Sequence, residues 1–164
     1  MKVFGITGWK NTGKTGLVER LVTEISARGF SVSTIKHAHH SFDVDHEGRD
    51  SYRHRGAGAR EVLLSSGTRW ALMHELRGAP EVPLSVLLTK LSPVDLILIE
   101  GFKAEGHEKL ECHRAEAGKA VLAKEDATIV AVASDVELDV SQVVFDLNDT
   151  QKITDFILAQ VGLG

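Results

Sequence analysis

The chain has a single cysteine, no excess of positive charge and no long apolar run. Cys112 alone provides neither a disulfide framework nor a Cys-x-x-Cys metal or redox motif. A formal net charge of −4 argues against a general binder of nucleic acids or membrane surfaces. No apolar stretch approaches the roughly 20 residues that a membrane-spanning helix needs. The N-terminus enters a strand pattern directly and shows no signal-peptide pattern, so we expect a cytoplasmic protein.

What remains is the composition of a globular protein, and we expect one domain over residues 1–164. Hydrophobic residues make up 43% and charged residues 26% of the chain, which is ordinary for a packed domain. Its length suffices for a core without disulfides or metals. Strand patterns alternate with helical patterns, which predicts an α/β fold with a mostly parallel sheet flanked by helices.

The individual elements can be placed from their periodicity. We expect strands at 2–7, 31–37, 60–66, 93–101, 109–114, 128–135 and 142–147. Helical spacing recurs over 17–25, before Gly29, and over 84–91, and we expect the last helix at about 150–161. The uninterrupted apolar run 93–101 favours a central strand covered on both faces. A short helix is expected to begin within 51–59, and 68–76 fits no single pattern. Asn148 and Gln151 have the spacing of a capping box before the last helix.

The stretch GWKNTGKT, residues 8–15, lies between the first strand and the first helix. It matches the pattern G-x-x-x-x-G-K-[ST] of a loop that binds nucleotide phosphates. Glycines permit positive φ and let backbone N–H groups approach the phosphates, which the helix N-terminus also attracts. The motif predicts a P-loop NTPase-like fold, with Lys14 neutralising phosphate and the Thr15 hydroxyl on Mg²⁺. The expected nucleotide contacts are Gly8, Lys10, Asn11, Thr12, Gly13, Lys14, Thr15 and Gly16.

Two acidic residues at strand ends are candidates for the rest of this site. Glu100 ends the apolar strand, so we expect it to order Mg²⁺ and water and, with Lys14, to carry any catalysis. Asp95 lies at the opposite end of that strand. Asp135 follows a late strand and suits the N1–H and N2–H₂ groups of guanine, but it equally suits a cap or a turn. No Asn-Lys-x-Asp sequence is present, so motifs alone do not separate GTP from ATP.

Residues 36–59, KHAHHSFDVDHEGRDSYRHRGAGA, concentrate histidines, carboxylates and arginines. Imidazole and carboxylate suit zinc or nickel, but His-x-His-His at a strand exit sends the rings to opposite faces. The surrounding lysine and arginines suit anionic phosphate better. We therefore favour contacts with phosphate or substrate, with Asp45 and Asp50 as outer contacts of Mg²⁺, over a transition-metal site or a loop without a role. The candidates are His37, His39, His40, Asp45, Asp50 and Arg53.

These three segments, GWKNTGKT, the 36–59 segment and DLILIEGFK, together resemble the molybdopterin-guanine dinucleotide biosynthesis protein B family. The second segment is distinctive, and the resemblance runs over nearly the whole chain. It implies a GTP-binding accessory protein with weak GTPase activity. Such a protein assists a guanylyltransferase of the MobA type in attaching GMP to molybdopterin, which gives its guanine dinucleotide. The resemblance also implies a homodimer, with 68–76 as a candidate antiparallel extension of the sheet between subunits.

Three other functions fit the same residues. A metallochaperone GTPase would use the histidines to carry Ni²⁺ or Zn²⁺, and a small-molecule kinase would use Glu100 or a loop aspartate as base. A third alternative is an adaptor that uses nucleotide only as a conformational latch. Because sequence alone places no arginine finger or glutamine at the phosphates, we expect slow hydrolysis.

Overall fold

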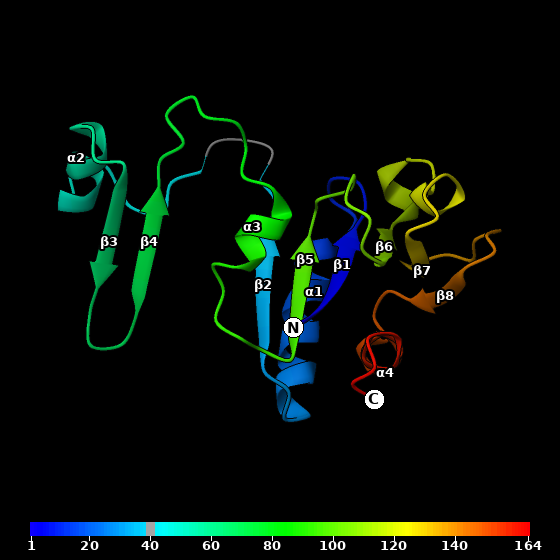
Figure 1. The fold of residues 1–164 in the computed structure, drawn as a ribbon. Coiled ribbons are helices and arrows are strands. Elements are labelled where there is room, and N and C mark those ends of the chain that lie inside the picture. Colours follow the sequence, from blue (N-terminus) through cyan, green and yellow to red (C-terminus); the bar gives the residue numbers. More distant parts are fainter. Residues whose placement is uncertain (39–41) are drawn as a thin grey trace. The chain divides into compact units, whose positions relative to one another are not determined.

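The computed structural model describes residues 1–38 and 42–164, which divide into two compact units (Figure 1). The first unit contains 1–37 and 88–164, and the second contains 38–87. Helix α3 (Leu84–Leu88) crosses this boundary in the sequence. The expectation of one domain over the whole chain stays a prediction.

The first unit contains a sheet of six parallel strands in the order β2-β5-β1-β6-β7-β8. Their bounds are β1 (Lys2–Thr7), β2 (Val32–Lys36), β5 (Leu96–Glu100), β6 (Lys109–His113), β7 (Ile129–Ser134) and β8 (Val143–Asp146). All five residues of β5 are buried between β2 and β1, as expected for an interior strand. Because the strands are parallel, their carboxyl ends share one edge of the sheet. The expected fold class is confirmed, with antiparallel pairing found in a second, two-stranded sheet.

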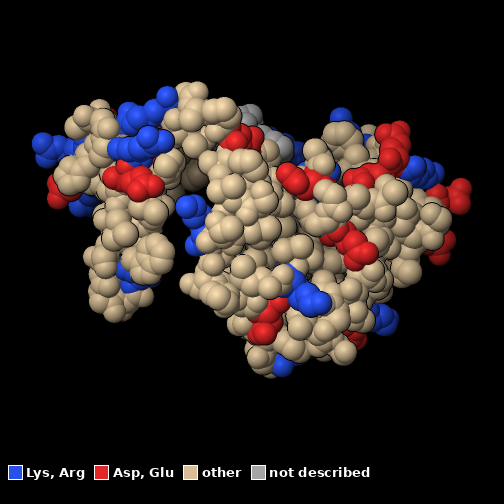
Figure 2. Space-filling view, viewed as in Figure 1, with Lys and Arg blue, Asp and Glu red and all other residues tan. Residues whose placement is uncertain are grey.

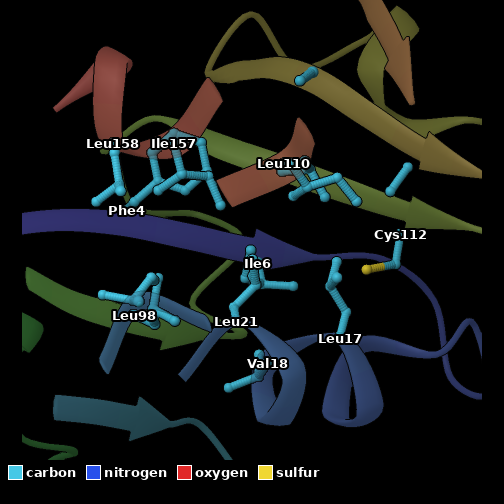
Figure 3. Close-up of a cluster of buried hydrophobic side chains, with 14 of the residues drawn as sticks. Phe4, Ile6, Leu17, Val18, Leu21, Leu98, Leu110, Cys112, Ile157 and Leu158 are labelled. Carbon is cyan, nitrogen blue, oxygen red and sulfur yellow. The ribbon is translucent and has the colours of Figure 1, made fainter. Parts of the chain in front are cut away.

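Helices α1 (Lys14–Ala27) and α4 (Thr150–Gln160) pack against each other and onto this sheet. Leu17, Leu21 and Ile25 recur at helical spacing on α1, and all three are fully buried. Figure 3 shows the resulting core, with Phe4 and side chains of β6 among those of the two helices. Two short 3₁₀ turns, η1 (Ala115–Ala117) and η2 (Leu122–Lys124), lie between β6 and β7. This packing holds α1 in place directly after the end of β1.

The start of α4 corrects one prediction. The helix begins after Asp149, whose carboxylate accepts a hydrogen bond from the Lys152 N–H at 3.2 Å. The Asn148 N–H instead donates to Asp146 at 2.8 Å, within the turn that follows β8. The capping box expected from Asn148 is therefore wrong by one residue, because both residues are good caps and the turn decides where the helix begins.

The second unit contains α2 (Asp50–Gly56) and the antiparallel pair β3 (Glu61–Ser65) and β4 (Trp70–His74). The segment that fits no sequence pattern thus contains a strand. Arg55 on α2 holds the unit together by binding the carboxylates of Asp43, Asp45 and Glu75. Since its guanidinium spans the loop before α2 and the residue after β4, this one side chain links three segments of the unit.

The surface carries charges of both signs. On the face drawn in Figure 2, lysines and arginines are interspersed with aspartates and glutamates. Within the described parts of the chain, no helix is both long and apolar enough to span a bilayer.

Candidate functional site

Residues 8–13 form a tight loop between β1 and α1. Gly8 has a φ of +137° and Gly13 a φ of +92°, conformations that residues with a Cβ rarely adopt. A Cβ on Gly8 would overlap the Cys112 carbonyl oxygen and lie 2.8 Å from Thr12 Oγ1. Gly13 is also the N-cap of α1, and no side chain caps this helix. No side chain therefore competes for the first-turn N–H groups of α1, which the motif predicts to bind phosphate.

Side chains within the loop fix its shape. Buried Thr12 donates its hydroxyl hydrogen to the Trp9 carbonyl at 2.9 Å, and the Lys14 ammonium donates to the same oxygen at 2.5 Å. Burial, with smaller effects from the nearby ammonium groups of Lys103 and Lys36, lowers the pKa of Lys14. Lys10 and Asn11 are exposed on the loop, and Asn11 has a φ of +66°.

The acidic strand end lies beside this loop. Glu100 ends β5 in register with Ile6 of β1, and only 9% of it is exposed. The Thr15 hydroxyl donates to Glu100 Oε1 at 3.3 Å, so the two expected Mg²⁺ ligands are brought together. Asp95, at the other end of β5, accepts hydrogen bonds from the N–H and hydroxyl of Ser31. Its role is to join β2 to β5 away from the site.

Asp135 follows β7 at the same edge of the sheet. Its Oδ1 accepts a hydrogen bond from the Ala115 N–H at 2.9 Å, which fixes the loop after β6. It also lines a pocket of about 490 Å³ formed by residues 134–138 and 144–146. Next to Ala115, the Arg114 guanidinium lies 3.2 Å from the position of a Cβ on Gly13. Arg114 therefore connects the surroundings of Asp135 with the phosphate loop.

The histidine-rich segment is divided between the two units. His37 belongs to the first unit, where its N–H donates to the Glu100 carbonyl at 2.9 Å and its ring packs on Phe102. His39 and His40 lie outside the described residues. Asp50 and Arg53 are exposed on α2 in the second unit.

Asp45, expected near Mg²⁺, binds Arg55 instead. Two hydrogen bonds of 2.5 and 3.2 Å join the buried carboxylate to the guanidinium. These bonds lower the pKa of Asp45 and raise the pKa of Arg55. In this arrangement both groups neutralise each other instead of facing a ligand.

Two further residues near the phosphate loop could not be identified from sequence motifs. Arg114 sits at the end of β6, and Lys103 lies with its ammonium 4.5 Å from the centre of the Trp9 ring. Both follow the carboxyl end of a strand that flanks β1, where parallel strands place ligand-binding residues. That signal is usable only once the strand order is known.

Comparisons with known proteins agree with this geometry. The family model for molybdopterin guanine dinucleotide synthesis protein B matches residues 3–135. Molybdopterin-guanine dinucleotide biosynthesis adapter proteins of Escherichia coli (strain K12) and Haemophilus influenzae are both 40% identical to the chain. The first alignment covers 95% of this chain and 91% of the relative, and the second covers 94% and 86%.

Solved structures give the same result. The crystal structure of a MobB protein homolog from Bacillus stearothermophilus matches with a TM-score of 0.75 at 26% identity, over 100% of both chains. A crystal structure of molybdopterin-guanine biosynthesis protein B has a TM-score of 0.74 at 23% identity, over 96% of this chain and 99% of that one, which shows the shared fold. Because the family model covers most of the chain and two relatives are 40% identical over more than nine-tenths of it, the chain belongs to the molybdopterin guanine dinucleotide synthesis protein B (MobB) family.

Proposed function

We propose that this protein binds GTP with Mg²⁺ on residues 8–15 and acts as an accessory protein in making molybdopterin guanine dinucleotide. The observation that carries the proposal is the uncapped N-terminus of α1 behind the Gly8–Gly13 loop, with Thr15 and Glu100 in contact beside it. Relatives at 40% identity are named adapter proteins of this biosynthesis. The comparisons give no support to a metal carrier or a kinase. Among residues 1–38 and 42–164, no group of three or more His, Cys, Asp or Glu is arranged to hold a metal ion.

The donor atoms beside the loop suit Mg²⁺. Thr15 and Glu100 supply a hydroxyl and a carboxylate oxygen, the ligands that this ion prefers. The ammonium of Lys36 already lies 3.0 Å from Glu100 Oε1, so the position attracts a cation. When bound, Mg²⁺ would neutralise charge between the β- and γ-phosphates. Lys14 would leave the Trp9 carbonyl for the phosphates, and the backbone N–H groups of the loop would orient them.

Slow hydrolysis follows from the same geometry. The chain has three glutamines, at positions 142, 151 and 160. Gln142 donates to the Ala123 carbonyl, and the other two lie on α4. None of them lies on the phosphate loop or at the end of β5, where a side chain would orient the attacking water. We therefore propose that GTP serves mainly to set the state in which the protein meets its partner.

Calorimetric titration tests the nucleotide site. GTP should bind in the presence of Mg²⁺, and Lys14→Ala should weaken it at least about 100-fold because a charge-assisted contact to phosphate is lost. Lys152→Ala is the matched control, since that lysine pairs with Asp149 on α4, far along the chain from the loop. Absence of GTP binding by the wild type, or equal binding by Lys14→Ala, would overturn the proposal.

We propose that the pocket lined by Asp135 receives the guanine base. This carboxylate can accept hydrogen bonds from the N1–H and N2–H₂ groups of guanine. The adenine of ATP presents an acceptor beside its amino donor at this edge, so it does not match the carboxylate. Asp135→Ala should reduce the ratio of GTP to ATP affinity about tenfold. An unchanged ratio would leave Asp135 with its structural role at Ala115.

The partner is proposed to be a molybdopterin guanylyltransferase of the MobA type, with molybdopterin or its guanine dinucleotide as the shared ligand. A purified guanylyltransferase supplied with molybdopterin and GTP should form product faster when this protein is added. The same assay with Lys14→Ala separates a requirement for bound nucleotide from simple docking. No change in product formation with either protein would contradict the accessory role.

We also propose a homodimer that uses the β3–β4 pair. Leu63 and Leu72 face each other across the two strands, and 60% and 47% of them are exposed. Trp70 on the same face is 65% exposed. Contiguous exposed apolar side chains of this size mark contact surfaces. Light scattering should give twice the chain mass, and Leu72→Glu should shift the protein toward the monomer.

A further inference from the structure

Lys36 occupies an unusual position beside the phosphate loop. It is the last residue of β2, in register with Glu100 of β5. Its ammonium lies 3.0 Å from Glu100 Oε1 and 3.4 Å from Thr15 Oγ1. These two oxygens are themselves 3.3 Å apart. The ammonium thus contacts both oxygens that are expected to bind Mg²⁺.

We infer that Lys36 is the built-in cation of the nucleotide-free site and that it moves to the terminal phosphate when Mg²⁺ and a nucleoside triphosphate bind. The inference rests on the proposed function. The nearly buried Glu100 carboxylate needs a countercharge, and Lys36 supplies it. An ammonium therefore stabilises the arrangement of Thr15 and Glu100 before the metal arrives.

Mg²⁺ and the ammonium cannot both stay on Glu100 Oε1. A divalent ion takes its oxygen ligands at about 2.1 Å, which would bring it close to the ammonium at a steep electrostatic cost. Lys36 is free to leave, because 57% of its side chain is exposed and its four-carbon stem is flexible. The nearest new anions are the β- and γ-phosphates that share the same Mg²⁺. Of these two, the terminal γ-phosphate is the one that a diphosphate lacks.

Two measurable consequences follow. Removing the ammonium should strengthen binding of a divalent ion to the nucleotide-free protein, since the ion no longer displaces a cation. The same change should weaken binding of a triphosphate and leave a diphosphate nearly unaffected. A purely structural ion pair between Lys36 and Glu100 would also compete with a divalent ion, but it does not predict a loss of affinity confined to the triphosphate. Lys36 is therefore a positioning residue that distinguishes the two nucleotide states.

The test uses the full chain and the variants Lys36→Gln and Lys36→Arg. Mn²⁺ is titrated into nucleotide-free protein and followed by paramagnetic resonance. GTPγS and GDP are titrated calorimetrically with Mg²⁺ present. Lys152→Gln is the matched control, because Lys152 also forms an exposed ion pair, 2.8 Å from Asp149. Thermal melting establishes that each variant is folded.

For Lys36→Gln we expect Mn²⁺ affinity to rise about fivefold or more and GTPγS affinity to fall about tenfold, with GDP affinity changed less than about twofold. Lys36→Arg should retain most of the GTPγS affinity, and Lys152→Gln should behave as the wild type. Unchanged Mn²⁺ affinity, or equal losses for GTPγS and GDP, would overturn the inference. If the wild type binds neither nucleotide, the proposed function is overturned instead. The Mn²⁺ titration then still tests whether Lys36 competes with a divalent ion at Glu100.

Discussion

Replacing Gly8 by alanine tests whether the shape of the phosphate loop depends on a missing side chain. The backbone φ of +137° costs a residue with a Cβ about 1–3 kcal/mol. The new Cβ would also overlap the carbonyl oxygen of Cys112 and approach Thr12 Oγ1 to 2.8 Å. Because one of these neighbours is the backbone of buried strand β6, the loop must move, at a further cost of about 1–3 kcal/mol.

The expected loss in the free energy of unfolding is therefore roughly 2–6 kcal/mol. For a chain of this length it corresponds to a fall in Tm of about 5–20 °C. GTP binding should be lost as well, because the loop N–H groups no longer converge on phosphate. Urea unfolding followed by circular dichroism, together with GTP calorimetry, measures both quantities.

Gly29→Ala provides the matched control. Gly29 also has a positive φ, +89°, but apart from its own chain neighbours nothing lies within 4 Å of the position of its Cβ. It should lose only about 1–2 kcal/mol from backbone strain and bind GTP as the wild type does. If Gly8→Ala is as stable as Gly29→Ala and binds GTP normally, the steric reasoning fails.

Three further predictions concern single side chains. Glu100→Gln should weaken Mg²⁺-dependent GTP binding roughly 10–100-fold, because the carboxylate charge beside Thr15 is lost; a titration of Mg²⁺ at fixed GTP measures it, and an unchanged midpoint would remove Glu100 from the metal site. Burial raises the pKa of the Cys112 thiol to about 12, so a disulfide reagent at pH 8 should label it in urea but hardly in the native protein, and rapid native labelling would contradict this burial. Burial, aided by the neighbouring Lys109 ammonium, lowers the pKa of His107 below its ordinary value near 6.5. Below about pH 6.5 the His107 imidazole is protonated more fully in the unfolded chain than in the native protein, so stability should fall as the pH drops. The Tm of His107→Gln should therefore fall less between pH 7.5 and 5 than the Tm of the wild type.

Much of the site could be predicted from the sequence because its signal is local. The phosphate loop joins one strand to the next helix, so Gly8, Gly13, Lys14 and Thr15 are brought together by a few consecutive backbone conformations. The apolar run ending at Glu100 likewise identifies itself as a buried strand, whatever its neighbours. The family resemblance rests on the same contiguous segments.

Other features depend on partners far along the chain. The salt bridge of Arg55 with Asp45 could not be predicted from the sequence, because a guanidinium suits a carboxylate as well as a phosphate. The fold of residues 42–75 decides between these two partners. Asn148 and Asp149 are both good caps, and the turn after β8 decided between them.

By itself the sequence determined the α/β class, the phosphate loop and the strand that carries Glu100, since each is written in short-range spacing. The tertiary structure alone decided which strand ends meet. The parallel order β2-β5-β1-β6 brings Lys36 to Glu100 and Arg114 to the loop, although these residues are up to about a hundred positions from their neighbours. Which strands pair depends on how the whole sheet is buried, and no local sequence pattern specifies it.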